Sequence, residues 1–269
     1  MSAGAVKQNL RWPPIVAEAA RIVKSYEDTG VTLRQLFYRL VAAELLPNTT
    51  TAYSTLSDRT AVARRAGTFP ALIDRGRAIH RHVWWDSPEK AREALRRQYR
   101  RDRTEGQRYT IYLGVEKSGM IAQLEHWFGD LGTPILALGG YASQSYVDDV
   151  RADAEQGRDS VLLYAGDFDP SGEDIPRDFA ARAGCFAAVR RIALTPEQVD
   201  AYHLPEQMVK QKDTRAPKFV AKYGRGVVEM DALPPDVLSG LYRGAIVEFM
   251  DMSAYHESLA REAAEKARL

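Results

Sequence analysis

Cysteine is almost absent from this chain of 269 residues, in which Cys185 is the only one. A single thiol excludes an internal disulfide and every zinc or iron–sulfur site that needs several cysteines. Long apolar runs are also missing, because no stretch approaches the roughly 18 residues of a membrane-spanning helix. The N-terminus lacks the charged and apolar regions of a signal peptide. We therefore expect a soluble cytoplasmic protein with no membrane association.

Net charge is scarce too, at +1, but this small value conceals an uneven distribution. Residues 1–104 carry 19 Lys and Arg against 10 Asp and Glu, whereas residues 105–269 carry 18 against 26. A basic first part joined to an acidic second part suggests that one part contacts a polyanion while the other holds cations. With 45% hydrophobic and 27% charged residues, the chain has the composition of a globular protein.

The basic part begins with three amphipathic segments that predict helices over residues 13–24, 32–41 and 50–66. Pro47 separates the second from the third. A helix, a proline-containing turn and an arginine-bearing helix are typical of helix-turn-helix and winged-helix units, so we expect DNA binding. The candidate DNA contacts on the third helix are Arg59, Arg64 and Arg65.

A second arginine-rich segment spans residues 92–103. Arg96 and Arg100 are its candidate contacts to DNA phosphates, with a solvated linker helix as the alternative. Just before it, we expect Trp84 and Trp85 to pack in the core or between domains rather than to stack on bases.

After Gly106 the pattern changes to an alternation of strands and helices. Predicted strands cover residues 109–115, 134–138, 161–165 and 187–193, and predicted helices cover 118–128, 143–154 and 173–183. This order predicts an α/β fold with a Rossmann-like parallel sheet. We divide the chain into a basic winged-helix-like domain (1–104), a sheet domain (105–195) and a mostly helical C-terminal extension (196–269) with a short strand at 227–230.

Acidic residues follow two of the predicted strands. Glu116 ends the first strand, and Asp167 and Asp169 come directly after the third. The carboxyl ends of parallel strands meet at one edge of a sheet, so these three side chains should converge there. Neighbouring carboxylates repel each other unless a cation lies between them, and hard oxygen ligands favour Mg²⁺ or Mn²⁺.

Three other interpretations of the aspartate pair remain open. The run from Asp167 resembles an EF-hand loop, but a strand precedes it and its twelfth position is Asp178 instead of glutamate. An aspartyl-phosphate phosphatase also places Asp-x-Asp after a strand, although nearer the N-terminus. A turn with solvated aspartates is the simplest alternative.

Arg34 and Tyr38 lie one helical turn apart and therefore share a face of the second predicted helix. An arginine there could hold a phosphate beside the hydroxyl and favour the phenolate. The alternative is a tyrosine at the edge of the core, with its ring packed and its hydroxyl in water.

Three segments together resemble a Toprim domain: Tyr112-Leu-Gly-Val-Glu-Lys117, Ile135-Leu-Ala-Leu-Gly-Gly-Tyr141 and Tyr164-Ala-Gly-Asp-Phe-Asp-Pro-Ser-Gly-Glu-Asp-Ile175. The chain is most similar to the topoisomerase VI A subunit and its meiotic relative Spo11, here in a short bacterial or phage form. Upstream, Thr32-Leu-Arg-Gln-Leu-Phe-Tyr38 is similar to the motif whose last tyrosine is the nucleophile of that family.

The resemblance implies metal-dependent cleavage of double-stranded DNA by a homodimer, with Tyr38 as the nucleophile and Arg34 on the phosphate. Asp167 and Asp169 would hold Mg²⁺ or Mn²⁺, and Glu116 would be a further metal ligand or the acid/base for the sugar hydroxyl. Lys117 would help Arg34 on the phosphate. No glycine-rich ATP-binding segment occurs, so an ATPase would be a separate subunit, and the protein would associate with the nucleoid. Two alternatives are a Toprim nuclease that uses water as the nucleophile and a non-catalytic DNA-binding subunit of a larger complex.

Overall fold

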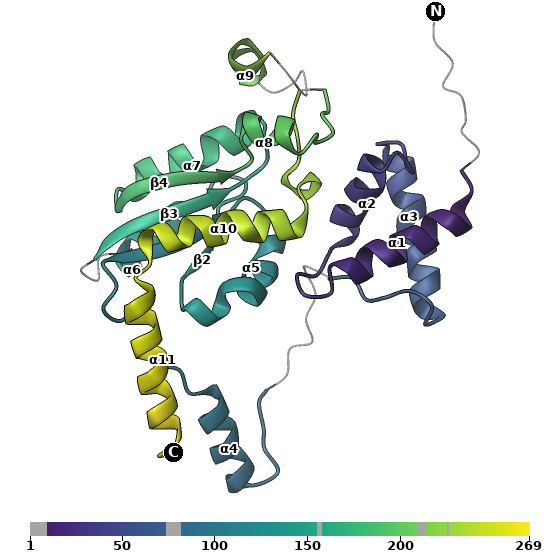
Figure 1. Cartoon of the computed structure of the whole chain (residues 1–269). Helices are drawn as coiled ribbons and strands as arrows, with labels where there is room; N and C mark the ends of the chain where they lie inside the picture. The colour runs from purple at the N-terminus through teal and green to yellow at the C-terminus, as the bar shows by residue number, and fades with distance from the viewer. Residues whose placement is uncertain (1–9, 74–81, 155–157, 209–213, 225) are drawn as a thin grey trace, which may run out of the picture.

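The structure, a computed structural model, describes residues 10–73, 82–154, 158–208, 214–224 and 226–269. Its N-terminal part is a unit of three helices, α1 (Trp12–Ser25), α2 (Leu33–Ala42) and α3 (Thr50–Arg65), set to one side of the sheet (Figure 1). Thr32 and Thr49 cap α2 and α3, each accepting a hydrogen bond from a backbone amide of the first turn. Leu36, Leu40 and Leu56 are fully buried in the core.

A winged helix also needs a β-hairpin beside its helices. Among the described residues of the N-terminal unit, the one β-bridge joins Thr32 to Ile73, and no hairpin follows α3 before residue 73. Residues 74–81 lie outside the described residues. The structure thus contains the predicted helices but does not show the predicted wing.

The predicted parallel sheet is confirmed. Its strands are β1 (Tyr109–Val115), β2 (Ile135–Ala137), β3 (Asp159–Ala165) and β4 (Phe186–Ala193), in the spatial order β2-β1-β3-β4. Every neighbouring pair is parallel, and Val115 pairs with both Ala137 and Ala165. The three strands β1, β2 and β3 therefore end at the same level, which aligns the loops that follow them.

Helices cover both faces of the sheet (Figure 1). Side chains of α5 (Ile121–Phe128) and α10 (Pro235–Phe249) share one buried cluster with the odd-numbered β1 residues Ile111 and Leu113. Side chains of α6 (Gln144–Ala154) and α7 (Pro170–Ala183) share the other cluster with Tyr112. Because both faces are buried, the strands are nearly continuous apolar runs, as is usual for parallel sheets.

The C-terminal extension contains α8 (Pro196–Ala201), α9 (Ala216–Tyr223), a 3₁₀ turn at Met230–Ala232, α10 and α11 (Met252–Lys266). The strand expected at 227–230 is reduced to two isolated bridges, from Val227 to Gln207 and from Val228 to Phe168. Further upstream, α4 (Pro88–Gln98) lies beside α11 at the end of the molecule away from α9 (Figure 1). None of the described helices has the length and apolar character needed to cross a membrane.

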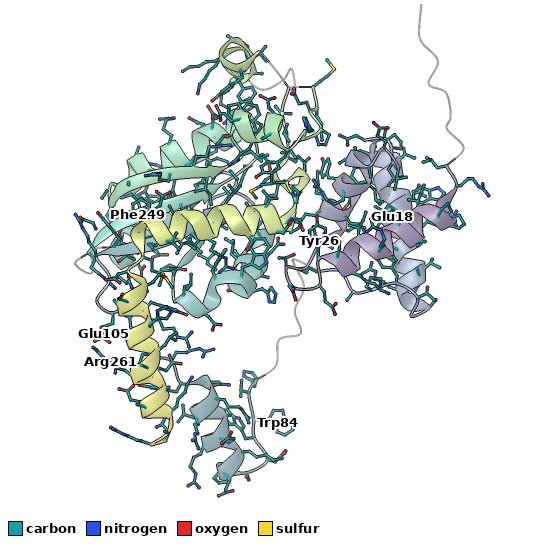
Figure 2. The ribbon with its side chains drawn as sticks, in the orientation of Figure 1. Glu18, Tyr26, Trp84, Glu105, Phe249 and Arg261 are labelled. Atoms are coloured by element: carbon teal, nitrogen blue, oxygen red, sulfur yellow. The ribbon has the colours of Figure 1, made fainter. Side chains whose placement is uncertain are left out.

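The prediction that Trp84 and Trp85 are packed is wrong. They are 74% and 46% exposed, because their segment runs outside the core before α4. Figure 2 shows Trp84 beside α4 and away from the sheet.

Candidate functional site

The loops after β1 and β3 bring Glu116 and Asp167 into direct contact. The amide of Glu116 donates to the carbonyl of Ala165 at 3.0 Å, and the amide of Asp167 donates to Glu116 Oε2 at 2.8 Å. Gly172 closes over them, since a Cβ there would lie 2.0 Å from the Asp167 carbonyl and 3.2 Å from Glu116 Oε2. The glycine of the sequence motif therefore makes room for the two acidic residues.

The Glu116 carboxyl group lies in an environment that disfavours its charge. Burial and the nearby Asp167 carboxylate raise the pKa of Glu116 to about 7, and Asp169 adds to this effect. Burial also raises the pKa of Asp167, although Lys117 acts in the opposite direction. These carboxyl groups thus resist ionisation where the fold places them.

Asp169 lies at the start of α7 and caps that helix. Its Oδ1 accepts a hydrogen bond from the amide of Gly172 at 2.6 Å. Its charge nevertheless acts on Glu116, so Asp169 belongs to the same electrostatic group. The structure therefore brings the three predicted acidic residues to one edge of the sheet, with one Asp169 oxygen engaged by the helix.

Two acidic residues that the sequence analysis did not select complete the group. Lys117 Nζ lies 3.1 Å from Asp167 Oδ1, 3.2 Å from Asp231 Oδ2 and 3.5 Å from Glu229 Oε2. Burial alone would lower the pKa of the Lys117 ammonium, but Asp231, Asp167 and Glu229 together raise it. A signal for them exists in the acid-x-acid spacing of Glu229 and Asp231 after the short apolar pair at 227–228.

The three-helix unit docks against this group through α2. Arg34 Nη2 donates to Glu229 Oε1 at 2.5 Å, and Arg34 Nε lies 3.9 Å from Asp231 Oδ2. One turn along, Arg39 donates to the carbonyl of Ala232. The predicted phosphate-binding arginine is thus joined within one chain to two carboxylates of the C-terminal extension.

Tyr38 lies beside Arg34 at this junction and is only 3% exposed. Its hydroxyl accepts a hydrogen bond from Gln207 Nε2 at 2.9 Å. Burial and the charge of Glu229 raise the pKa of Tyr38, whereas Arg34 and Lys117 oppose that rise. The arrangement therefore disfavours the phenolate, and the hydroxyl faces a polar environment instead of open water.

Two hollows meet at this junction and share Arg34 and Tyr53. The first, of about 510 Å³, contains Tyr38 with Asn48, Gln207 and Glu229 among its lining residues. The second, of about 420 Å³, brings Lys117 and Arg64 to the same space as Arg34. The second hollow therefore combines three cations with the carboxylate of Asp231.

The predicted DNA-contacting arginines fall into two separate places. Arg59, Arg64 and Arg65 are exposed on α3, and Arg64 also lines the second hollow. Arg96 is exposed on α4, and Arg100 lies 3.5 Å from Asp130 and 3.6 Å from Glu262. Because α4 lies beside α11, the structure does not bring Arg96 and Arg100 together with the arginines of α3 (Figure 1).

Within the part of the chain that the structure describes, no three His, Cys, Asp or Glu side chains are arranged as a ready metal-binding group. The donors available at the sheet edge are carboxylates, which are the ligands that Mg²⁺ and Mn²⁺ prefer. No protein-family model and no curated protein matches this sequence.

Proposed function

We propose that this chain cleaves double-stranded DNA by a metal-dependent transesterification in which Tyr38 is the nucleophile. One observation carries the proposal: Tyr38 and Arg34 on α2 line one hollow with Glu229, and Lys117 connects Glu229 to Asp167 after β3. The resemblance to Toprim domains and to the topoisomerase VI A subunit supports the same chemistry. Under this proposal the family's winged-helix role falls to residues 1–104, and residues 105–195 form the Toprim domain.

In the proposed reaction, Tyr38 Oη forms a bond to a backbone phosphorus and the bond from phosphorus to the neighbouring sugar oxygen breaks. The phenolic proton leaves through the hollow that Tyr38 lines, and the departing sugar oxygen takes up a proton from Glu116. The product is a phosphotyrosyl ester, on the 5′ end as in the family it resembles, and a free hydroxyl on the other side of the break.

Arg34 and Lys117 would bind the non-bridging oxygens of the scissile phosphate, since both line the hollow that adjoins Tyr38. Asp167 and Asp169, with Glu116 as an alternative third ligand, would hold Mg²⁺ or Mn²⁺. The ion would stabilise the charge that develops on the phosphate and on the leaving oxygen. For Asp167 to take that role, Lys117 must exchange its contact with the aspartate for one with the phosphate.

A homodimer would give staggered cuts in the two strands of the duplex, because a two-fold axis relates two such sites. A separate ATPase subunit and an association with the nucleoid in the cytoplasm belong to the same proposal. Within one chain Tyr38 shares a hollow with Glu229.

The test is incubation of the purified protein with supercoiled plasmid and Mg²⁺ or Mn²⁺, with and without proteinase digestion before electrophoresis. We expect wild-type protein to form covalent adducts with DNA and Tyr38→Phe to form none while still binding DNA. Tyr53→Phe is the matched control, since Tyr53 lines both hollows without being placed in the reaction. Adducts that persist in Tyr38→Phe would remove Tyr38 from its role.

A hydrolytic nuclease with the same acidic residues is the second candidate. The burial of Tyr38, at 3% exposure, and its raised pKa favour this alternative, because water would then be the nucleophile. Nicking without any adduct, unchanged by Tyr38→Phe but lost in Asp167→Asn, would select it.

A further inference from the structure

The short helix α9 is fixed directly on the acidic motif. Phe168, between Asp167 and Asp169, is completely buried, and its ring lies 5.0 Å from that of Phe219 and 4.9 Å from that of Tyr223. Both partners belong to α9. The outer face of α9 is therefore held in a set position next to the candidate site.

Four cationic side chains gather where α9 faces α7. Arg177, Arg215, Lys218 and Lys222, here called the α9 patch, line a hollow of about 270 Å³. The same hollow contains two carboxylates, Glu173 and Asp174. The hollow is therefore lined by more cations than carboxylates, although residues 105–269 as a whole are acidic.

The contacts within the α9 patch hold its cations in place without burying them. Lys222 Nζ lies 3.0 Å from Glu173 Oε2, and Arg177 Nη2 lies 2.5 Å from Asp174 Oδ1. Arg177, Lys218 and Lys222 are exposed, so these ion pairs are weak and can exchange a carboxylate for another anion.

Arg215 connects the patch to the loops at the end of the sheet. Its Nη2 donates to Ser171 Oγ at 2.8 Å, and its guanidinium lies over the ring of Tyr141 at 5.8 Å. Ser171 is in the first turn of α7, and Tyr141 follows the glycine pair after β2. The patch is thus continuous with the edge where Asp167 and Asp169 lie.

We infer that the α9 patch binds backbone phosphates of the DNA duplex beyond the scissile bond, an inference that rests on the proposed function. Phosphates complement the excess positive charge, and exposed lysines and arginines bind them by releasing condensed counterions. Figure 1 shows α9 above the sheet domain and the three-helix unit beside it. The duplex therefore contacts two separate surfaces, one on α3 and one on α9.

The test measures how the DNA affinity depends on salt. A fluorescein-labelled duplex is titrated with protein in EDTA, so that no cleavage occurs, at several KCl concentrations. The double variant Lys218→Ala/Lys222→Ala should lower the slope of log K against log [KCl] by about 1.8, the value for two lost phosphate contacts. The loss should be equal for unrelated DNA sequences, because phosphates carry no base identity.

Arg261→Ala is the matched control. The Arg261 side chain is 55% exposed and the Lys222 side chain is 59% exposed, and each forms weak ion pairs with surface carboxylates. Figure 2 shows it on α11, remote from α9 in Figure 1. We expect the control to keep the wild-type slope. Circular dichroism and thermal unfolding confirm that each variant is folded.

A wild-type slope in the double variant overturns the inference, and adduct formation by the same protein would leave the proposed function standing. A reduced slope without any metal-dependent cleavage supports the α9 patch and overturns the proposed function. Absence of DNA binding by the wild type overturns both.

Discussion

The molecule has two clusters of charged residues, and they differ in the balance between carboxylates and cations. At the edge of the sheet, five carboxylates from Glu116, Asp167, Asp169, Glu229 and Asp231 face two cations, Lys117 and Arg34. Beside α11, in what is called here the α11 cluster, five cations face five carboxylates: Arg100, Arg101, Arg103, Arg261 and Lys266 against Glu105, Asp130, Glu257, Glu262 and Glu265. The first cluster has negative charge in excess, and the second has none.

The carboxyl groups respond in opposite directions. Arg103 holds Glu262 in a two-pronged contact at 2.8 and 3.0 Å, and this hydrogen bonding keeps the pKa of Glu262 far below its usual range. Burial and Asp167 instead raise the pKa of Glu116 to about 7. A satisfied ion-pair cluster stabilises the fold, whereas carboxylates with raised pKa values and too little counter-charge are typical of a functional site.

The largest expected effect is on the acidic cluster as a reaction centre. Asp167→Asn should slow DNA cleavage by about 10³-fold, since losing the charge stabilisation of a bound cation is worth several kcal/mol. Asp130→Asn removes one negative charge from the α11 cluster instead, and its cleavage rate should stay within about twofold of the wild-type rate. Initial rates of plasmid cleavage measure both effects. Equal rates for the two variants would show that the acidic cluster is not the reaction centre.

The next largest expected effect is on the free energy of unfolding, and here the α11 cluster is the more sensitive of the two. Arg103→Leu leaves the Glu262 carboxylate, 4% exposed, without its main partner, and should cost about 3 kcal/mol of unfolding free energy. Urea denaturation monitored by circular dichroism gives the value. Exposed Arg97, paired with Glu93 at 3.4 Å, supplies the control Arg97→Leu, which should cost less than about 1 kcal/mol.

At the sheet edge we expect a smaller change in the free energy of unfolding, and an increase instead of a decrease. Glu116→Gln should stabilise the metal-free protein at pH 8 by about 1 kcal/mol, because it removes a charge that the folded state disfavours. The glutamine can still accept the hydrogen bond from the Asp167 amide. Destabilisation in the same urea experiment would show that Glu116 is a structural ion-pair partner after all.

The smallest expected effect is on how the stability of the folded protein depends on pH, which differs between the two clusters. The raised pKa of Glu116 gives stability that is present below its unfolded value of about 4.3 and is lost as pH rises towards about 7. The lowered pKa of Glu262 gives stability that is present above its unfolded value and is lost as pH falls below it. In metal-free buffer, thermal midpoints should decline on both sides of about pH 5. Glu116→Gln should flatten only the alkaline side, and a decline there that is unchanged would contradict the assignment.

Much of the sheet domain could be predicted, because its signals are local. Apolar runs gave β1 and β3, and the ends of parallel strands fixed the meeting of Glu116 with Asp167. Tertiary partners were not visible in the same way. Glu229 and Asp231 lie more than 60 residues beyond Asp167 in a segment with only two isolated bridges, so no periodicity marked their place.

The arginines show the same limit. Arg34 was correctly placed on a helix, but its ion pair with Glu229 depends on how the three-helix unit docks. The crowded arginines before Gly106 were predicted to form either a phosphate-binding surface or a solvated linker helix, yet the Arg103 side chain contacts Glu262 in the α11 cluster and is only 8% exposed. Charge composition identified which residues are basic, and packing decided which of them are available to a ligand.

The most direct test of the account is whether the acidic cluster binds a divalent cation. Titration of the protein with Mn²⁺, followed through the electron paramagnetic resonance signal of the free ion, measures this without any DNA. We predict that wild-type protein and Asp130→Asn bind Mn²⁺ equally, and that Asp167→Asn loses affinity at least about tenfold. Equal binding by wild type and Asp167→Asn, or no binding by either, would contradict the claim that the sheet edge is a metal centre.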